Sequence, residues 1–143
     1  MTEEAFTALE RELSLLMRRA RARSEELARQ VHPDIDGTAY VLLATVASTG
    51  GMRASELAAR FGVDKGAISR QVARLEQLGL VTRAADPDDR RALVIGTTSE
   101  GQRRVEAAVA RRRERFRARL SDWTDDDVEQ LADLLSRYNA SFE

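Results

Sequence analysis

The sequence predicts a mainly α fold with a small β-wing, a winged helix-turn-helix of about six helices. Two short helical patterns, separated by Gly62, are followed by two β-prone runs. A turn rich in aspartate and arginine, residues 86–91, separates these runs. Longer helical patterns lie on both sides of this central segment. Their apolar residues exceed what so small a unit can cover, so we expect an intertwined homodimer.

The composition is typical of a helix-rich protein without membrane segments. The 143 residues suit one domain, and 43% are hydrophobic, 33% charged and 5% aromatic. No apolar run approaches the roughly 18 residues that cross a bilayer. The acidic, amphipathic N-terminus is unlike a secretory signal. We therefore expect a cytoplasmic protein with no membrane partner.

Several kinds of chemistry are unfavourable in this chain. It has no cysteine and a single histidine, His32, so thiol chemistry is excluded and neither a metal nor another cofactor is expected. The acidic residues fall in caps, turns and exposed faces. No nucleophile–base pair or buried carboxylate pair is recognisable. We therefore do not expect an enzyme.

The net charge of −1 conceals a strong segregation of charge. Residues 53–91 carry eight basic and six acidic side chains, and residues 100–119 carry eight basic and three acidic. Residues 120–143 carry one basic and seven acidic side chains. One face can therefore be positive while the chain is nearly neutral. For the arginines between residues 111 and 119, we favour a charge network over DNA contact.

The N-terminal third predicts two helices. The first spans about residues 3–30, where apolar residues spaced three and four apart form a narrow seam typical of contact with a partner helix. Pro33 and Gly37 then interrupt the pattern. The second helix, about residues 38–48, is almost wholly apolar and should be buried on most sides.

Two more helices are expected after the wing. Thr98 is a suitable N-cap for a long helix through Leu120, and Thr124 with Asp127 resembles a capping box that opens the last helix. We expect residues 1–143 to form a single domain, with dimerisation helices at 1–35 and 100–143 around a DNA-binding lobe at 36–99. The candidate dimer-interface residues are Phe6, Leu9, Leu13, Phe116, Leu120, Trp123, Leu131, Leu134, Leu135 and Tyr138.

The helix between Asp64 and Gly79 separates into two faces on a helical wheel. Ile68, Val72 and Leu75 should point inward. The other face combines small residues, which let the backbone approach a groove, with arginines that can pair with guanine O6 and N7. Its candidate DNA-binding residues are Lys65, Gly66, Ala67, Ser69, Arg70, Ala73, Arg74 and Gln77. A plain solvated helix is the alternative, but a glycine inside a helix costs ~1 kcal/mol.

The two β-prone runs, residues 80–83 and 92–95, predict a hairpin with Arg90 and Arg91 at its tip. An exposed arginine there can enter a narrow minor groove. Asp89 could hold one of these arginines through a charged hydrogen bond. An ordinary polar turn remains the alternative.

Residues 53–101 resemble the MarR family of bacterial transcription regulators. The resemblance rests on SELAARFGVDKGAISRQVARLEQLGLV, then R-x-x-D-P-x-D-R-R, then T-x-x-G. It implies a triangular homodimer with a winged helix-turn-helix in each lobe. The recognition helix would run from Asp64 to Leu78, with Asp89 and Arg91 as the wing's D-x-R and Arg91 in the minor groove. Two positions differ from the family's usual residues: Thr97 replaces a leucine, and Arg53 replaces a hydroxyl-bearing residue.

The resemblance also implies the function. We expect a repressor that binds a pseudo-palindromic double-stranded operator and is released by a small aromatic or phenolic ligand. The pocket candidates are Met17, Arg21, His32, Tyr40 and Ala44. His32 could instead be an ordinary helix-end residue, and Tyr40 a core residue. The alternative function is a dimeric winged-helix module that binds another protein.

Overall fold

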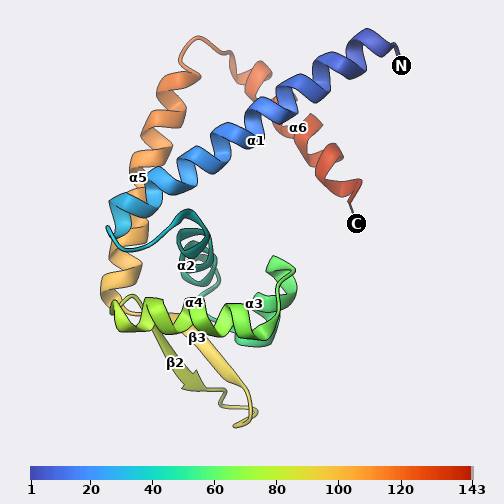
Figure 1. Ribbon diagram of the computed structural model, residues 1–143. Helices are drawn as coiled ribbons and strands as arrows, with labels where there is room; N and C mark the ends of the chain where they lie inside the picture. The colour runs from blue at the N-terminus through green and yellow to red at the C-terminus, as the bar shows by residue number, and fades with distance from the viewer. Residues whose placement is uncertain (143) are drawn as a thin grey trace. The chain divides into compact units, whose positions relative to one another are not determined.

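The computed structural model describes residues 1–142, which form six helices and three strands (Figure 1). The elements are α1 (Glu3–Val31), α2 (Gly37–Thr49), β1 (Met52–Arg53), α3 (Ala54–Phe61), α4 (Lys65–Gln77), β2 (Val81–Ala85), β3 (Leu93–Thr97), α5 (Ser99–Arg119) and α6 (Asp125–Ala140). The predicted mainly α fold with a small β-wing is confirmed. The short strand β1 was not predicted. Among residues 1–142, no helix has the length and apolarity that crossing a membrane requires.

The chain divides into two compact units, Met1–Ala108 and Val109–Glu143. The first unit holds α1 to β3 and the first half of α5. Its core includes the fully buried side chains of Leu42, Leu43, Leu57, Leu75, Leu80 and Ile95. Helix α2 contacts α1, α4 and β3, which agrees with its almost wholly apolar sequence.

Helix α2 begins at Gly37, where the sequence pattern suggested an interruption. Asp36 is the N-cap, and its carboxylate accepts the Ala39 N–H at 2.8 Å. Glu25 on α1 accepts the Gly37 N–H at 3.0 Å. A Cβ on Gly37 would lie 2.7 Å from this Glu25 oxygen. The glycine therefore permits a close contact between α1 and α2 instead of breaking the helix.

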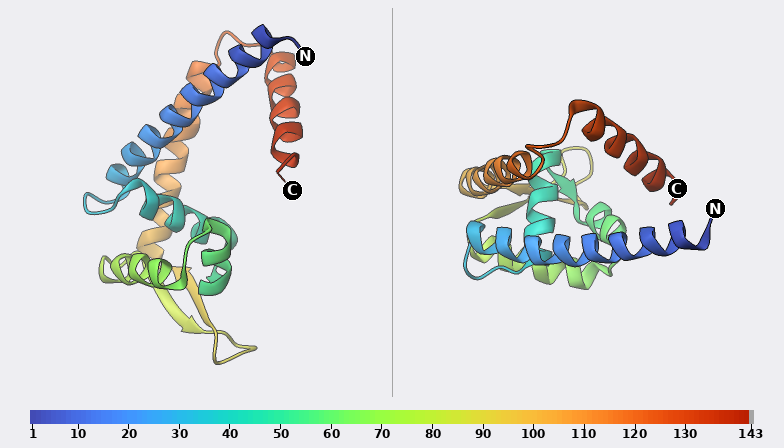
Figure 2. Two further views of the ribbon diagram at one scale, coloured as in Figure 1. Left: turned by 45° about the vertical axis from the view of Figure 1, so that its right-hand side comes forward. Right: turned by 90° about the horizontal axis from the view of Figure 1, so that it is seen from above.

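The three strands form one antiparallel sheet in the order β1-β3-β2. Val81 pairs with Thr97 and Ala85 with Leu93, so β2 and β3 form the predicted hairpin. Arg53 of β1 pairs with Val94 on the other edge of β3. The hairpin extends away from α4 in both side views of this unit (Figure 1, Figure 2).

The start of α5 packs closely against the link between α4 and β2. Thr98 caps α5 as predicted, since its hydroxyl oxygen accepts the Gly101 N–H at 3.0 Å. The same hydroxyl donates to the Gly79 carbonyl at 2.6 Å. A Cβ on Gly101 would overlap the Leu80 carbonyl oxygen. Position 101 therefore requires glycine because a backbone group occupies the space.

The second unit contains the rest of α5 and α6. The predicted capping box at Thr124 and Asp127 is confirmed by reciprocal side-chain-to-backbone bonds. These bonds lower the pKa of Asp127, first through the Thr124 N–H and then through its hydroxyl. No residue of α6 is buried, although one face carries Val128, Leu131, Leu134, Leu135 and Tyr138.

We expect Gly101→Ala to lower the free energy of unfolding by about 1–3 kcal/mol, because the added methyl group would have to displace the Leu80 backbone. Urea denaturation of the full chain measures this change. Gly96→Ala is the matched control, since its Cβ would meet only the Thr82 hydroxyl, at 3.7 Å. Equal stability of Gly101→Ala and wild type would contradict this account of the junction.

Candidate nucleic-acid interface

Helix α4 has the orientation that its sequence pattern predicts. Asp64 caps it, accepting the Ala67 N–H at 2.7 Å. Ile68, Val72 and Leu75 are buried against the core. Gly79, with a φ of 73°, adopts the left-handed conformation that ends the helix. The helix is therefore held by its cap and by its inward apolar stripe.

The opposite face of α4 carries all the predicted DNA-binding residues of the helix. Lys65, Gly66, Ser69, Arg70, Arg74 and Gln77 are exposed, and Ala67 and Ala73 are partly exposed. Within residues 1–142, the side chains of Lys65 and Arg70 make no hydrogen bond or ion pair. The face presents a small-residue surface next to an arginine that can adopt a new partner.

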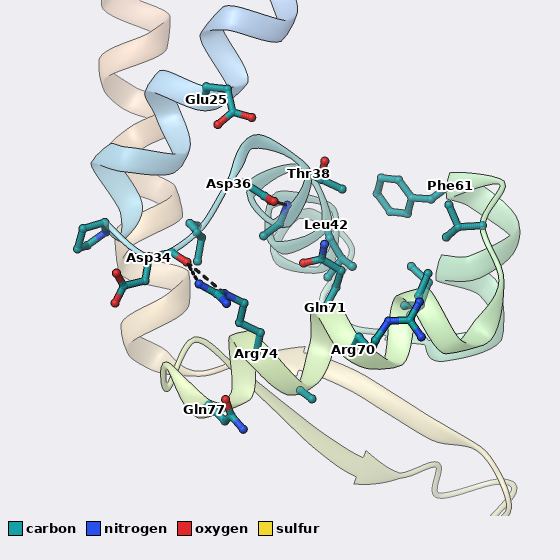
Figure 3. A pocket seen from close by; sticks show the side chains of 17 residues that line it. Glu25, Asp34, Asp36, Thr38, Leu42, Phe61, Arg70, Gln71, Arg74 and Gln77 are labelled. Carbon is teal, nitrogen blue, oxygen red and sulfur yellow. Dashed lines mark hydrogen bonds between the residues drawn. The ribbon is translucent and has the colours of Figure 1, made fainter.

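Arg74 differs from Arg70 because it already has a partner. Its Nε and Nη2 donate to the Asp34 carbonyl oxygen at 3.2 and 2.7 Å (Figure 3). Asp34 lies in the loop between α1 and α2, 40 positions earlier in the chain. The sequence pattern alone does not distinguish the two arginines. The structure instead gives Arg74 a bond that fastens this loop to α4.

A cavity of about 1050 Å³ lies beside α4 in the same unit (Figure 3). Its apolar lining includes Ile35, Leu42, Phe61 and Val63. Arg70, Ala73, Arg74 and Gln77, all from the candidate DNA-binding face, also line it. The cavity was not predicted, because it depends on the α1–α2 loop lying next to α4.

None of the five predicted pocket residues lines this cavity. Met17 and Arg21 are exposed on α1, Ala44 is partly buried, and Tyr40 belongs to the core at 4% exposure. His32 ends α1, and its Nδ1 accepts the Asp34 N–H at 3.0 Å. The two conservative interpretations, His32 at a helix end and Tyr40 in the core, agree with these positions.

The wing tip exposes both predicted arginines, Arg90 and Arg91. Asp89 accepts the backbone N–H of Arg91 at 3.0 Å, and its own carbonyl accepts the Ala92 N–H. The charged hydrogen bond predicted from Asp89 to an arginine side chain is not present among residues 1–142, because the Asp89 carboxylate binds the Arg91 backbone instead. Asp89 shapes the turn, and the Arg91 side chain remains available.

A long-range ion pair holds the base of the tip. Arg53 donates from Nε and Nη2 to one oxygen of Asp86, each at 2.7 Å. The other Asp86 oxygen accepts the Asp88 N–H at 2.8 Å. The pKa of Asp86 is lowered, first by this Asp88 N–H and then by the Arg53 side chain. The sequence places Asp86 in the turn but does not predict that Arg53 is its partner.

The two positions that differ from the family's usual residues are both accounted for by contacts. Arg53 stands at the N-cap of α3 without a side-chain capping bond, because a guanidinium has no acceptor for a helix N–H, and it donates to Asp86 instead. Thr97 is partly buried, and its hydroxyl donates to Gln102 on α5 at 2.8 Å. Among residues 1–142, no group of three His, Cys, Asp or Glu side chains is arranged to hold a metal.

Comparison with known proteins assigns the chain to a family. The model of the MarR family matches residues 34–92. An uncharacterized HTH-type transcriptional regulator of Bacillus subtilis, YxaD, is 32% identical over 94% of this chain and 92% of its own length. The chain belongs to the MarR family. Members of the MarR family regulate transcription by binding DNA and are not enzymes, so this chain is a MarR-family transcriptional regulator.

Solved structures of MarR-family proteins share its fold. A family member from Bacillus stearothermophilus superposes with a TM-score of 0.85 at 20% identity, covering 99% of this chain and 98% of that one. Apo MarR from Escherichia coli gives a TM-score of 0.72 at 23% identity, covering 91% and 95%. At these identities the likeness supports the winged helix fold alone. The residues that contact DNA must be argued from the chain itself.

Proposed function

We propose that this MarR-family chain is a homodimeric repressor that binds a pseudo-palindromic operator through α4 and the β2–β3 wing. A structure of an Escherichia coli MarR variant bound to operator DNA, 24% identical with a TM-score of 0.65, supports the mode of binding. The repressor MdtR of Bacillus subtilis, 30% identical over 67% of this chain and 62% of its own length, supports the direction of regulation.

The observation that carries the proposal is the exposed face of α4. Its inner stripe is buried, so the face with Gly66, Ala67 and Ala73 must point to solvent. Small side chains there let the helix backbone approach base edges, and Arg70 extends from the same face. The wing of the same compact unit exposes Arg90 and Arg91. One helix for a major groove and one arginine tip for the neighbouring minor groove form a winged-helix reader.

The decisive experiment is selection of DNA by the purified chain, followed by titration of a selected duplex at increasing salt. A DNA reader enriches a pseudo-palindrome with half-sites one helical turn apart, about 34 Å. The logarithm of its binding constant falls linearly with the logarithm of salt concentration, with a slope of about −0.9 per neutralised phosphate. A winged-helix module for protein binding would show no duplex binding at any salt, and that result would overturn the proposal.

Arg70→Ala should weaken binding to the selected duplex by about 1–3 kcal/mol and relax the preference for one base pair per half-site. Arg74→Ala should cost less, because Arg74 must release the Asp34 carbonyl before it can reach DNA. Fluorescence anisotropy with the selected duplex and its single-base variants measures both effects. A larger loss for Arg74→Ala would assign base reading to Arg74 instead.

The dimer part of the proposal rests on uncovered apolar residues within each unit. On α1, the exposed side chains include Phe6 and Leu9, while Leu13 on the same seam is only partly covered. On the second unit, the exposed interface candidates are Phe116, Trp123, Leu131, Leu134, Leu135 and Tyr138, and Leu120 is partly covered. Large apolar side chains left exposed along one face of a helix are typical of an association site. A symmetric copy is the partner that two-fold operator symmetry requires.

Leu134→Glu should shift the chain from dimer to monomer at micromolar concentration, because Leu134 is 53% exposed in the single chain and a buried unpaired carboxylate is costly. Sedimentation velocity measures the shift. Ser136→Glu introduces the same charge on the opposite side of α6 and should leave the dimer intact. Equal dissociation of both variants would indicate a general charge effect instead of an interface at Leu134.

Release by a small aromatic or phenolic anion completes the proposal. Met17, Arg21, His32, Tyr40 and Ala44 remain the candidates for a pocket between the dimer helices and the lobe. The cavity beside α4 offers another position, because a ligand there would touch Arg70 and Arg74 and compete with DNA directly. Arg74 lines the cavity beside α4 and is not one of the five other candidates. Arg74→Ala should therefore change the response to an effector only if the effector binds beside α4.

A further inference from the structure

Asp86 at the base of the wing tip is the one buried charged side chain within residues 1–142, at 8% exposure. A buried carboxylate is unfavourable unless charged or hydrogen-bonded partners surround it. Asp86 has both: the Arg53 guanidinium on one oxygen and the Asp88 N–H on the other. Its backbone N–H also donates to the Ala92 carbonyl at 2.9 Å, closing the tip. Asp86 is thus the point where the tip is fastened.

Arg53 reaches this point by crossing the sheet. It lies on β1 directly opposite Val94 of β3, and Val94 lies opposite Ala84 of β2. Directly opposed residues share a face of the sheet, so Arg53, Val94 and Ala84 lie on one face, and the Arg53 guanidinium meets Asp86 beyond the end of β2. Two strand spacings, about 10 Å, separate β1 from β2. Only a long side chain spans that distance, and a serine or threonine at position 53 could not.

The position of Arg53 in the chain makes this contact unexpected. It immediately precedes α3, where a hydroxyl side chain would cap the helix, and it makes no capping bond. Helix α3 therefore lacks a side-chain cap, whereas the wing has the ion pair between Arg53 and Asp86. Changing Arg53 to serine would create the sequence Ser-Ala-Ser-Glu, ending at Glu56, which has the spacing of a capping box.

We infer that Arg53 is a positioning residue of the DNA reader: through Asp86 it holds the wing tip so that Arg91 enters the minor groove. The inference rests on the proposed function, because it requires the wing to bind DNA. Arg53 contacts no DNA in this arrangement. Its effect on affinity passes entirely through Arg91, which lies five positions after Asp86 on the same closed tip.

The test is a double-mutant cycle of Arg53→Ser and Arg91→Ala on a duplex selected with the wild-type chain. Two versions of the duplex carry A·T-rich or G·C-rich flanks. Arg53→Ser should weaken binding to the A·T-flanked duplex roughly fivefold to twentyfold and reduce the preference for A·T flanks, as Arg91→Ala does. In the Arg91→Ala background it should cause no further loss.

A stability measurement separates this role from a merely structural one. The new cap on α3 should offset the lost ion pair, so the unfolding temperature of Arg53→Ser should stay close to that of wild type. Asp86→Asn breaks the same contact from the other side and should give the same loss of flank preference, without adding to Arg53→Ser. Arg60→Ser removes an exposed arginine from α3 and should leave flank preference unchanged.

Each other outcome overturns a specific claim. Additive losses for Arg53→Ser and Arg91→Ala would mean that Arg53 contacts a phosphate itself. Equal losses on both flanks with a lowered unfolding temperature would mean that the pair only stabilises the fold. An Arg91→Ala variant that binds like wild type would reject the wing's role in the proposed function, whatever Arg53 does.

Discussion

The burial of Ile68, Val72 and Leu75 against the core is the constraint on which the proposed DNA-reading surface depends. Since these residues recur at helical spacing, their burial leaves α4 a single possible rotation about its axis. That rotation places Gly66, Ala67 and Ala73 outward with Arg70. The position of this face therefore follows mainly from that of the opposite, buried stripe. Asp64 adds a fixed N-terminus, where unpaired backbone N–H groups favour a phosphate.

Arginines that donate to backbone carbonyls join the α1–α2 loop to the reading unit. Arg74 of α4 binds the Asp34 carbonyl, and Arg104 of α5 binds the Val31 carbonyl at 2.8 Å. Arg104 also pairs with Glu100, and the bonds from Arg103 and Arg104 lower the pKa of Glu100 to about 2. The last residue of α1 is thus fastened to α5, and the loop that follows α1 is fastened to α4. A movement of α1 would have to break these bonds or carry their partners with it.

The sequence predicted the features that depend on nearby residues and missed those that depend on distant ones. Thr124 with Asp127 is a capping box three positions long, and the inward stripe of α4 repeats every three or four positions. The Arg53–Asp86 pair spans 33 positions and the Arg74–Asp34 bond 40. Nothing local distinguishes Arg74 from Arg70, since both lie on the exposed face of one helix. Only the path of the α1–α2 loop decides which arginine is held. The cavity beside α4 depends on the same path.

The placement of the acidic residues explains how a chain of net charge −1 can present a basic reading surface. Asp64 is occupied by a helix cap, Asp89 by the Arg91 backbone N–H, and Asp86 by Arg53 and the Asp88 N–H. Each of these carboxylates accepts a backbone N–H and so helps to hold the backbone in place. Asp86 is also buried, and the positive charge of Arg53 balances its negative charge. The side chains of Lys65, Arg70, Arg90 and Arg91 make no hydrogen bond or ion pair within residues 1–142, and all four are exposed. An arginine can bind DNA only when its guanidinium is exposed and correctly oriented. The aspartates that lower the net charge also order the backbone that carries the exposed arginines, and so they favour binding through the remaining positive charge.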